Sequence, residues 1–194
     1  MEVYIIRHGE TVWNAAGKLQ GSKDIELNEN GREVAGELGR RLEKIAFDRI
    51  YCSPLIRAYE TACLIRGHRN IPIIRDERLR EICFGEMEGV NKREWMKEDS
   101  PYRFFFTEPA RYIPPRNGET LEALQERTRE FLQEEIEPKH DEWKRIMIVG
   151  HGALNKALMC HIEGHGTKNF WGNGLQNNCE ADIFEFDGNN WMRC

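Results

Sequence analysis

Ile5-Ile6-Arg7-His8-Gly9 near one end of the chain and Ile148-Val149-Gly150-His151-Gly152 near the other are the two stretches that decide the fold. Each is an apolar run, typical of a strand buried on both faces of a parallel sheet, that leads into a histidine and a glycine. In open parallel sheets the loops at the carboxyl ends of the strands line the ligand crevice, so both imidazoles should emerge at one edge. Glycine after each histidine lets the backbone approach a ligand closely. The two stretches therefore predict a joint site built on His8 and His151.

Shorter signals on either side of these stretches complete a sheet and its helices. Further apolar runs typical of strands lie at 49–52 and 71–74, and Pro72 places the second of them near a sheet edge. Apolar residues recur at helical spacing over 34–45, after a cap at Asn28, and again over 121–136 and 153–162. Two last runs, 181–186 and 191–193, flank a turn signal typical of a hairpin. The sequence therefore predicts an α/β three-layer sandwich, a mostly parallel central sheet flanked by helices, with a C-terminal β-hairpin.

Residues 90–117 follow neither period, and they gather aromatic side chains and four prolines among charges. We expect a helical insertion over the C-terminal ends of the strands, within a single domain that spans 1–194. Such a cover would be either a substrate lid or a satellite hydrophobic cluster, and the residues leave both open. Trp143, Trp171 and Trp191 are predicted to serve packing rather than to stack on a ligand.

The composition excludes several classes of function. Of the 194 residues 40% are hydrophobic, and no apolar run approaches the roughly 20 residues of a membrane helix. Lys and Arg total 28 against 33 Asp and Glu, a net charge of −5, which argues against nucleic acid or a membrane as partner. The amino-terminal residues do not resemble a signal peptide, and the six scattered cysteines lack metal-ligand spacing. We therefore expect a cytoplasmic protein with reduced thiols and no bound metal.

An anion-binding site is predicted where the strand at 49–52 ends. Ser53 suits a helix N-cap and Pro54 the first helical position, which would put Arg57 in the first turn. Free N–H groups, the helix dipole and a guanidinium group together favour an oxyanion. Because Arg7 stands beside His8, phosphate is the leading candidate for that anion.

A carboxylate-bearing loop at 79–89 follows the strand at 71–74. Glu81, Glu86 and Glu88 are its candidate proton donors for a leaving group. The residues alone do not choose among the three.

A longer series of motifs runs in order along the chain. It comprises Arg7-His8-Gly9-Glu10-Thr11 with Trp13-Asn14, Gln20-Gly21, Asp24 to Leu27 with Gly31, Ser53-Pro54-Leu55 with Arg57-Ala58 and Glu60-Thr61, Glu81 with Phe84-Gly85 and Glu88-Gly89, Gly118-Glu119-Thr120, and Gly150-His151-Gly152. This series resembles the histidine phosphatase superfamily, in its cofactor-dependent phosphoglycerate mutase-like branch. The resemblance covers essentially the whole chain. Within the superfamily, the sequence is similar to the broad-specificity and alpha-ribazole phosphatases.

The resemblance implies a metal-independent phosphomonoester hydrolase that works through a phosphohistidine intermediate and needs no cofactor. His8 would be the nucleophile, and Arg7, Arg57 and His151 would hold the phosphoryl oxygens. Glu81 would protonate the leaving oxygen and then activate water. The substrate-binding positions that the resemblance implies are Asn14, Thr11, Gln20, Gly21, Gly152 and Lys92. The substrate would be a small phosphorylated metabolite, and the chain would be a monomer or a homodimer.

The same pocket would serve a phosphoglycerate mutase if the phosphorylated product stayed bound. The short chain, Gln20 before Gly21 and Gly118-Glu119-Thr120 resemble phosphatases, whereas Gly89-Val90-Asn91-Lys92 resembles mutase sequences, with Lys92 facing a substrate carboxylate. Two other possibilities are a phosphoprotein phosphatase and an inactive relative that only binds phosphoesters. All five catalytic positions are present, which argues against the inactive relative.

Overall fold

The central element of the computed structural model, which describes residues 1 to 194, is a six-stranded sheet in the order β3-β2-β4-β1-β5-β6. Its strands are β1 (Glu2–Arg7), β2 (Arg49–Cys52), β3 (Ile73–Arg75), β4 (Arg145–Gly150), β5 (Ala181–Phe186) and β6 (Trp191–Arg193). The first four strands pair in parallel, and β5 and β6 add an antiparallel hairpin at one side. The predicted parallel sheet and C-terminal hairpin are confirmed.

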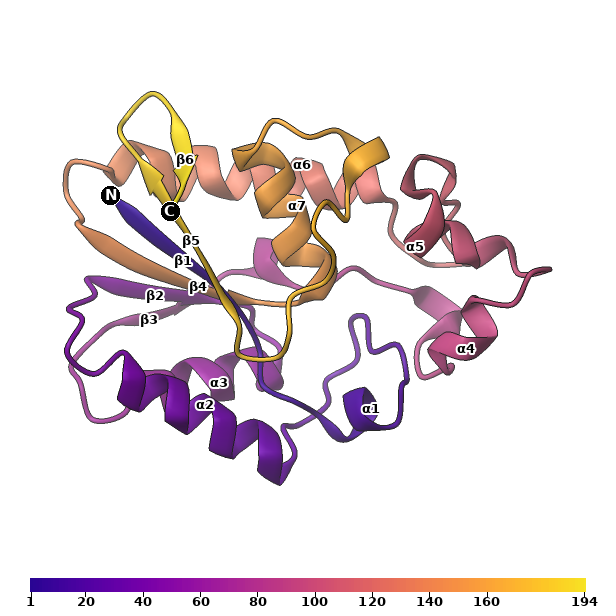
Figure 1. The fold of residues 1–194 in the computed structure, drawn as a ribbon, viewed down its shortest axis with the longest axis horizontal. Coiled ribbons are helices and arrows are strands. Elements are labelled where there is room, and N and C mark those ends of the chain that lie inside the picture. The colour runs from indigo at the N-terminus through magenta and orange to yellow at the C-terminus, as the bar shows by residue number, and fades with distance from the viewer.

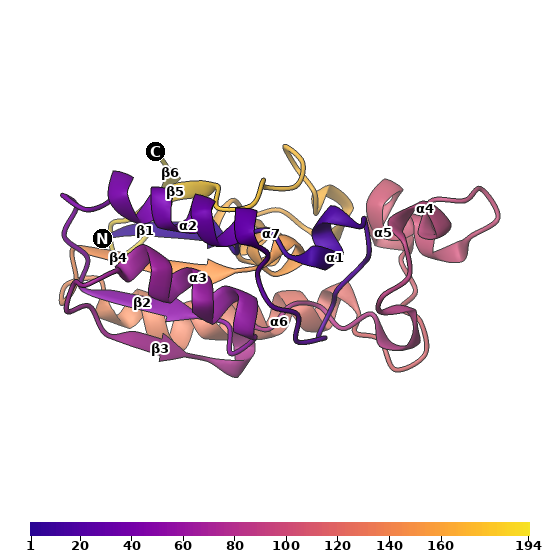
Figure 2. The same cartoon turned by 90° about the horizontal axis from the view of Figure 1, so that it is seen from below.

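Helices cover both faces of this sheet because its strands are apolar on both faces. Val3 and Ile5 of β1 pack against α6 (Leu121–Phe131) and α7 (Gly152–Ile162). Tyr4 and Ile6 point the other way, toward α2 (Glu29–Arg41) and α3 (Ile56–Arg66). β4 alternates in the same manner. Figures 1 and 2 show the resulting layers, with the strands lying between the two pairs of helices, so the predicted three-layer sandwich is confirmed.

Element boundaries agree with the expected ones in part. Asn28 caps α2, since its side chain accepts from the N–H of Gly31 at 2.7 Å. The helix ends at Arg41, so Ile45 lies beyond it. After α6 the backbone widens into a π-helical turn over Leu132–Ile136. β3 starts one residue after Pro72 and is an edge strand, as the proline indicated.

The expected start of the helix after β2 was wrong by two residues, since the first helical residue is Ile56 and not Pro54. Ser53 does not cap a helix: its hydroxyl accepts from the N–H of Leu55 at 3.2 Å, and α3 begins only at Ile56. The first N–H of α3 instead donates to the carboxylate of Asp24, at 2.6 Å, from a distant part of the chain. Arg57 still lies in the first turn, as predicted, and its side chain is fully buried.

The insertion at 90–117 is helical but broken into short pieces, including α4 (Lys92–Trp95) and α5 (Phe104–Thr107). Together with α1 (Val12–Ala15) these pieces lie beyond the carboxyl ends of the parallel strands (Figure 2). Trp95 and Phe105 are buried and belong to the same hydrophobic core as α6 and α7. The insertion is therefore continuous with the core and is not a satellite cluster.

Two further expectations concern the chain as a whole. None of the helices has both the length and the apolar character that crossing a membrane requires. All six cysteines are free thiols, and Cys52, Cys160 and Cys179 are buried.

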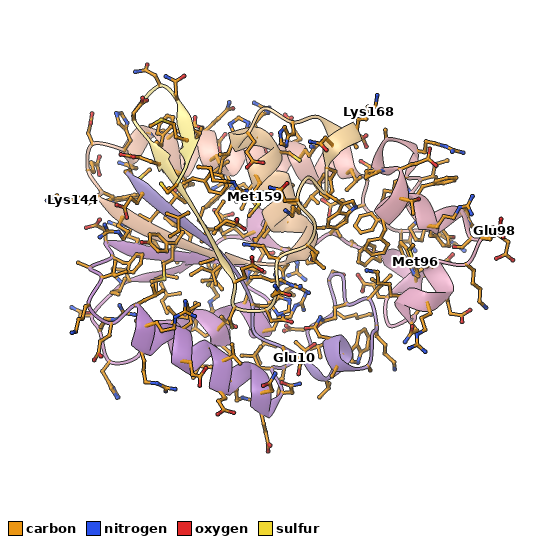
Figure 3. All side chains as sticks on the ribbon, in the orientation of Figure 1. Glu10, Met96, Glu98, Lys144, Met159 and Lys168 are labelled. Atoms are coloured by element: carbon orange, nitrogen blue, oxygen red, sulfur yellow. The ribbon has the colours of Figure 1, made fainter.

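Figure 3 shows the side chains on the ribbon, with the labelled Glu98 and Lys144 at opposite ends of the molecule.

The contact between α2 and α3 generates a stability prediction at Gly39. A Cβ there would stand 2.9 Å from the carbonyl oxygen of Leu64 and 3.0 Å from that of Ile65. Gly39→Ala should therefore lower the free energy of unfolding by about 1–3 kcal/mol, although alanine is the better helix former.

Gly36→Ala, in the same helix, is the matched control, since its Cβ would meet only the end of the Arg40 side chain at 3.7 Å. This variant should gain up to about 1 kcal/mol from helix propensity. Urea unfolding of both variants checks the prediction, and equal effects of the two substitutions would contradict the close approach of the helices.

Candidate phosphate-binding active site

The ends of β1 and β4 bring two imidazoles together. The ring centroids of His8 and His151 are 5.1 Å apart, and both side chains are buried. The N–H of His8 donates to the carbonyl of Gly150 at 3.0 Å, which extends the pairing of β1 and β4 by one step. Since the two strands are parallel neighbours, their repeated strand-His-Gly endings meet at one edge.

Hydrogen bonds fix the tautomer of each imidazole. Nδ1 of His8 lies 2.6 Å from the carbonyl oxygen of Gly9, which can only accept, so Nδ1 carries the proton and Nε2 has a free lone pair. Nε of Arg57 lies 3.2 Å from Nδ1 of His151 and can only donate. His151 therefore carries its proton on Nε2, a buried atom without a protein partner.

Two guanidinium groups, that of the fully buried Arg57 and that of the half-buried Arg7, lie near the imidazoles. Arg57 donates to the carbonyl oxygens of Lys23, at 2.7 Å, and Gly21, at 2.8 Å. Burial lowers the pKa of Arg57 to about 10, so it stays charged near neutral pH. Arg7 donates through one terminal nitrogen to the carbonyl of Gln176, whereas its buried Nε has no partner. Burial also lowers the pKa of Arg7, against the opposing charge of Glu81.

Burial and these cations together keep both imidazoles neutral. Burial lowers the pKa of His8 well below its usual 6.5, and the charges of Arg57 and Arg7 lower it further. Burial, Arg57 and the neighbouring His8 lower the pKa of His151 in the same way. At neutral pH the Nε2 lone pair of His8 is available for nucleophilic attack.

Glu81 sits at the amino terminus of α7. Its carboxylate accepts from the N–H groups of Leu154, at 2.9 Å, and Ala153, at 3.2 Å, and from its own neighbour Ile82 at 2.9 Å. A Cβ on Gly152 would stand 3.7 Å from Glu81 Oε2 and 3.9 Å from Arg7 Nε, so the acid and the unpartnered donor converge at this glycine.

The two other carboxylates of the loop face elsewhere. Glu88 accepts from the N–H and hydroxyl of Ser22 and from the N–H of Phe84. Glu86 is exposed. Among the three candidates, Glu81 alone lines the cavity beside His8.

The cavity has a volume of about 170 Å³. It is lined by Arg7, His8, Asn14, Gly17, Lys18, Leu19, Gln20, Gly21, Arg57, Glu81, Phe84, Lys92, Phe105, Phe106, Gly152, Ala153, Trp171 and Leu175. Four cationic side chains thus face one carboxylate, in a chain whose net charge is −5. The insertion contributes Lys92, whose Nζ lies 4.2 Å from the centre of the Phe106 ring. The local field suits a polyanion.

Most of the predicted substrate-binding residues lie at this cavity, but Thr11 does not. Thr11 is fully buried as the cap of α1, where its hydroxyl accepts from the N–H of Asn14 at 3.1 Å. It also approaches the side-chain oxygen of Gln20 at 3.0 Å. Thr11 therefore orients Asn14 and Gln20, both of which line the cavity, and the expectation of direct contact was wrong.

The expected packing role of Trp171 is confirmed, since it packs against the hydrophobic core, and the residue also lines the cavity. Its ring stacks on Phe106 with centroids 5.6 Å apart, and its Nε1 donates to the carbonyl of Phe105 at 2.6 Å. Trp171 lines the cavity, as do Lys18 and Leu175, which sequence reasoning did not single out. Aromatic enrichment of the insertion was the one signal that pointed to such a wall.

Comparison with known proteins identifies what this arrangement resembles. A model of branch 1 of the histidine phosphatase superfamily matches residues 3–193. Phosphoserine phosphatase 1 of Hydrogenobacter thermophilus is 32% identical over 179 residues, which cover 91% of this chain and 83% of that protein. A 2,3-bisphosphoglycerate-dependent phosphoglycerate mutase of Cytophaga hutchinsonii is 35% identical over 166 residues, covering 82% and 76%. The structure of Bacillus stearothermophilus YhfR superposes with a TM-score of 0.90 at 37% identity, covering 99% and 94%.

The buried neutral imidazoles generate a prediction about pH and stability. Because burial lowers the pKa of His8 in the folded state, the unfolded chain binds more protons below pH 6.5. The contribution of the neutral His8 to the free energy of unfolding is therefore fully present above that pH and is lost as the pH falls. His8→Asn should therefore lose clearly less stability than wild type when the pH falls from about 7 to about 5.

Urea unfolding at both pH values measures the effect. His68→Asn, at an exposed position, is the matched control and should leave the pH dependence of wild type unchanged. Identical pH dependence in wild type and His8→Asn would show that His8 is not held neutral by the fold.

Proposed function

This chain belongs to the histidine phosphatase superfamily, and we propose that it hydrolyses small phosphate monoesters through a phosphohistidine formed on Nε2 of His8. The observation that carries the proposal is a pair of buried N–H donors without protein partners, Nε of Arg7 and Nε2 of His151, beside a neutral imidazole. A buried donor left unpaired costs about 1–3 kcal/mol, so a ligand with acceptor oxygens is expected to satisfy both. A phosphoryl group presents such oxygens and also matches the charge of Arg57.

In the first step the Nε2 lone pair of His8 attacks phosphorus and the ester P–O bond breaks. Arg7, Arg57 and the Nε2–H of His151 stabilise the charge on the non-bridging oxygens. The leaving oxygen takes a proton from the Glu81 carboxyl, which gives a free alcohol and phosphohistidine.

In the second step water replaces the alcohol. Glu81, now a carboxylate, takes a proton from water as the oxygen attacks phosphorus. The P–N bond breaks, inorganic phosphate is released, and His8 returns to its neutral form. The same carboxylate thus serves as acid and then as base, and its hydrogen bonds to the first turn of α7 hold it in place.

Size and charge of the cavity support a small substrate that carries a second anionic group. Arg7 and Arg57 would neutralise the phosphate, and the cavity wall also carries Lys18 and Lys92, while Glu81 is its only carboxylate. Both ammonium groups lie near aromatic rings, Trp13 and Phe106, at 5.6 and 4.2 Å. The similarity to a phosphoserine phosphatase agrees with such a substrate.

The alternative is a phosphoglycerate mutase, which would return the phosphoryl group to a bound product. Lys92 and the similarity to a mutase favour that alternative. Hydrolysis is supported by Gln20 on the cavity wall and by the likeness of Gly118-Glu119-Thr120 to phosphatases. We propose hydrolysis in the cytoplasm, without a cofactor. All the groups that this chemistry needs come from one chain, so it applies to a monomer or to a homodimer.

Phosphate release from a panel of monoesters in the presence of EDTA tests the proposed reaction. Phosphoserine and 3-phosphoglycerate should be hydrolysed faster than esters of similar size without a carboxylate, and EDTA should change no rate. A parallel assay supplies 3-phosphoglycerate with catalytic 2,3-bisphosphoglycerate. Isomerisation with little release of phosphate would instead establish the mutase, and loss of all activity in EDTA would contradict the mechanism.

Glu81→Gln tests the proton donor, because glutamine keeps an acceptor for the N–H groups of α7 but cannot release the proton. Release of an alkyl alcohol in a single turnover should slow by about 10²- to 10⁴-fold. Release of p-nitrophenol, whose leaving group scarcely needs a proton, should slow far less. Glu86→Gln, at an exposed position, is the matched control. Equal losses of rate with the alkyl ester and the p-nitrophenyl ester would rule out Glu81 as the proton donor.

A further inference from the structure

The segment 176–180, between α7 and β5, wraps the end of β1, where Arg7 and His8 lie. Figure 1 shows this part of the chain turning beside that strand. The N–H of Cys179 donates to the carbonyl of Arg7 at 2.9 Å, and the N–H of Arg7 donates to the carbonyl of Glu180 at 3.1 Å. The side chain of Asn178 donates to the carbonyl of His8 at 2.8 Å. The segment thus holds the backbone of the two residues that face the phosphate.

Gln176 adds the single bond from this segment to the guanidinium of Arg7, through its backbone carbonyl. Gln176 is only 5% exposed, and its side chain forms all of its hydrogen bonds inside the fold. Nε2 donates to the carbonyl of Ile5, at 3.0 Å, and to the carboxylate of Asp182, at 2.7 Å. Oε1 accepts from the side chain of Asn155 at 2.8 Å. The amide therefore connects β1, β5 and α7 at one point.

We infer that Gln176 is a positioning residue for Arg7: its side chain anchors the carbonyl that orients the guanidinium toward the phosphate. The inference rests on the proposed function for its effect on catalysis. Without the anchor, the carbonyl of residue 176 would shift, and the Nε–H of Arg7 would lose its fixed direction. Displacements of about 1 Å in a group that binds the transition state cost on the order of 10²-fold in rate.

The charges around Asp182 explain why a neutral amide stands there. Asp182 also pairs with Arg193, which in turn pairs with Glu163. Gln176 Nε2 supplies a further donor to that carboxylate without adding charge beside Arg7. Methionine at this position would keep the side-chain volume but remove both the amide N–H donors and the amide oxygen acceptor.

Gln176→Met should lower kcat/KM by about 10- to 100-fold and weaken the binding of inorganic phosphate, measured by calorimetry, by about tenfold. A double-mutant cycle with Arg7→Met separates positioning from general damage. In the Arg7→Met background the second substitution should change either quantity by less than about twofold, because the group that it positions is gone.

Gly39→Ala provides the control for stability, since it perturbs packing far from the cavity. At a temperature where every variant is folded, it should bind phosphate as tightly as wild type does. Unchanged phosphate affinity in Gln176→Met, or equal losses in both backgrounds of the cycle, would overturn the inference. The measurement of phosphate binding still tests the inference if wild type releases no phosphate from esters. That outcome would contradict the proposed function alone.

Discussion

The placement of two guanidinium groups, one fully buried and one half-buried, against two buried imidazoles is the constraint on which the rest of the site depends. Burial, together with the charges of Arg57 and Arg7, lowers the pKa of His8 and so keeps its lone pair free, and the same charges attract a phosphoryl group. Such burial is costly, since charge is taken out of water. The cost is offset by carbonyl acceptors for Arg57 at Gly21 and Lys23. Two buried N–H groups, Nε of Arg7 and Nε2 of His151, remain unpaired and are left for the ligand.

The fold supplies this arrangement through one edge of the sheet. β1 and β4 end side by side in His8 and His151, and α7 begins immediately after His151, where its first N–H groups hold the carboxylate of Glu81. The turn from β4 into α7 therefore brings together His151, a hydrogen-bond donor for phosphate, and Glu81, the proposed general acid. The insertion, continuous with the core, adds Lys92 and the aromatic wall that would select the rest of the substrate.

Local patterns in the sequence predicted the layers, the parallel strands, the terminal hairpin and the pairing of His8 with His151. These features depend on periodicity and on the general geometry of parallel sheets. Features that depend on contacts between distant residues were missed or misplaced. The start of α3 is set by Asp24, which no local cap signal reveals, and Trp171 lines the cavity as well as stacking on Phe106. Thr11 is different, because the capping box formed with Asn14 is a local signal that was there to be found.

The most direct test of the account is to trap the phosphorylated enzyme. Turnover quenched in alkali, which preserves phosphohistidine, and followed by mass spectrometry and phosphorus NMR would locate the phosphoryl group. The account predicts a single phosphohistidine at His8, bonded through Nε2, because Nδ1 is committed to the carbonyl of Gly9. A phosphoryl group on His151, on Nδ1 of His8, or on no residue during rapid turnover would contradict it.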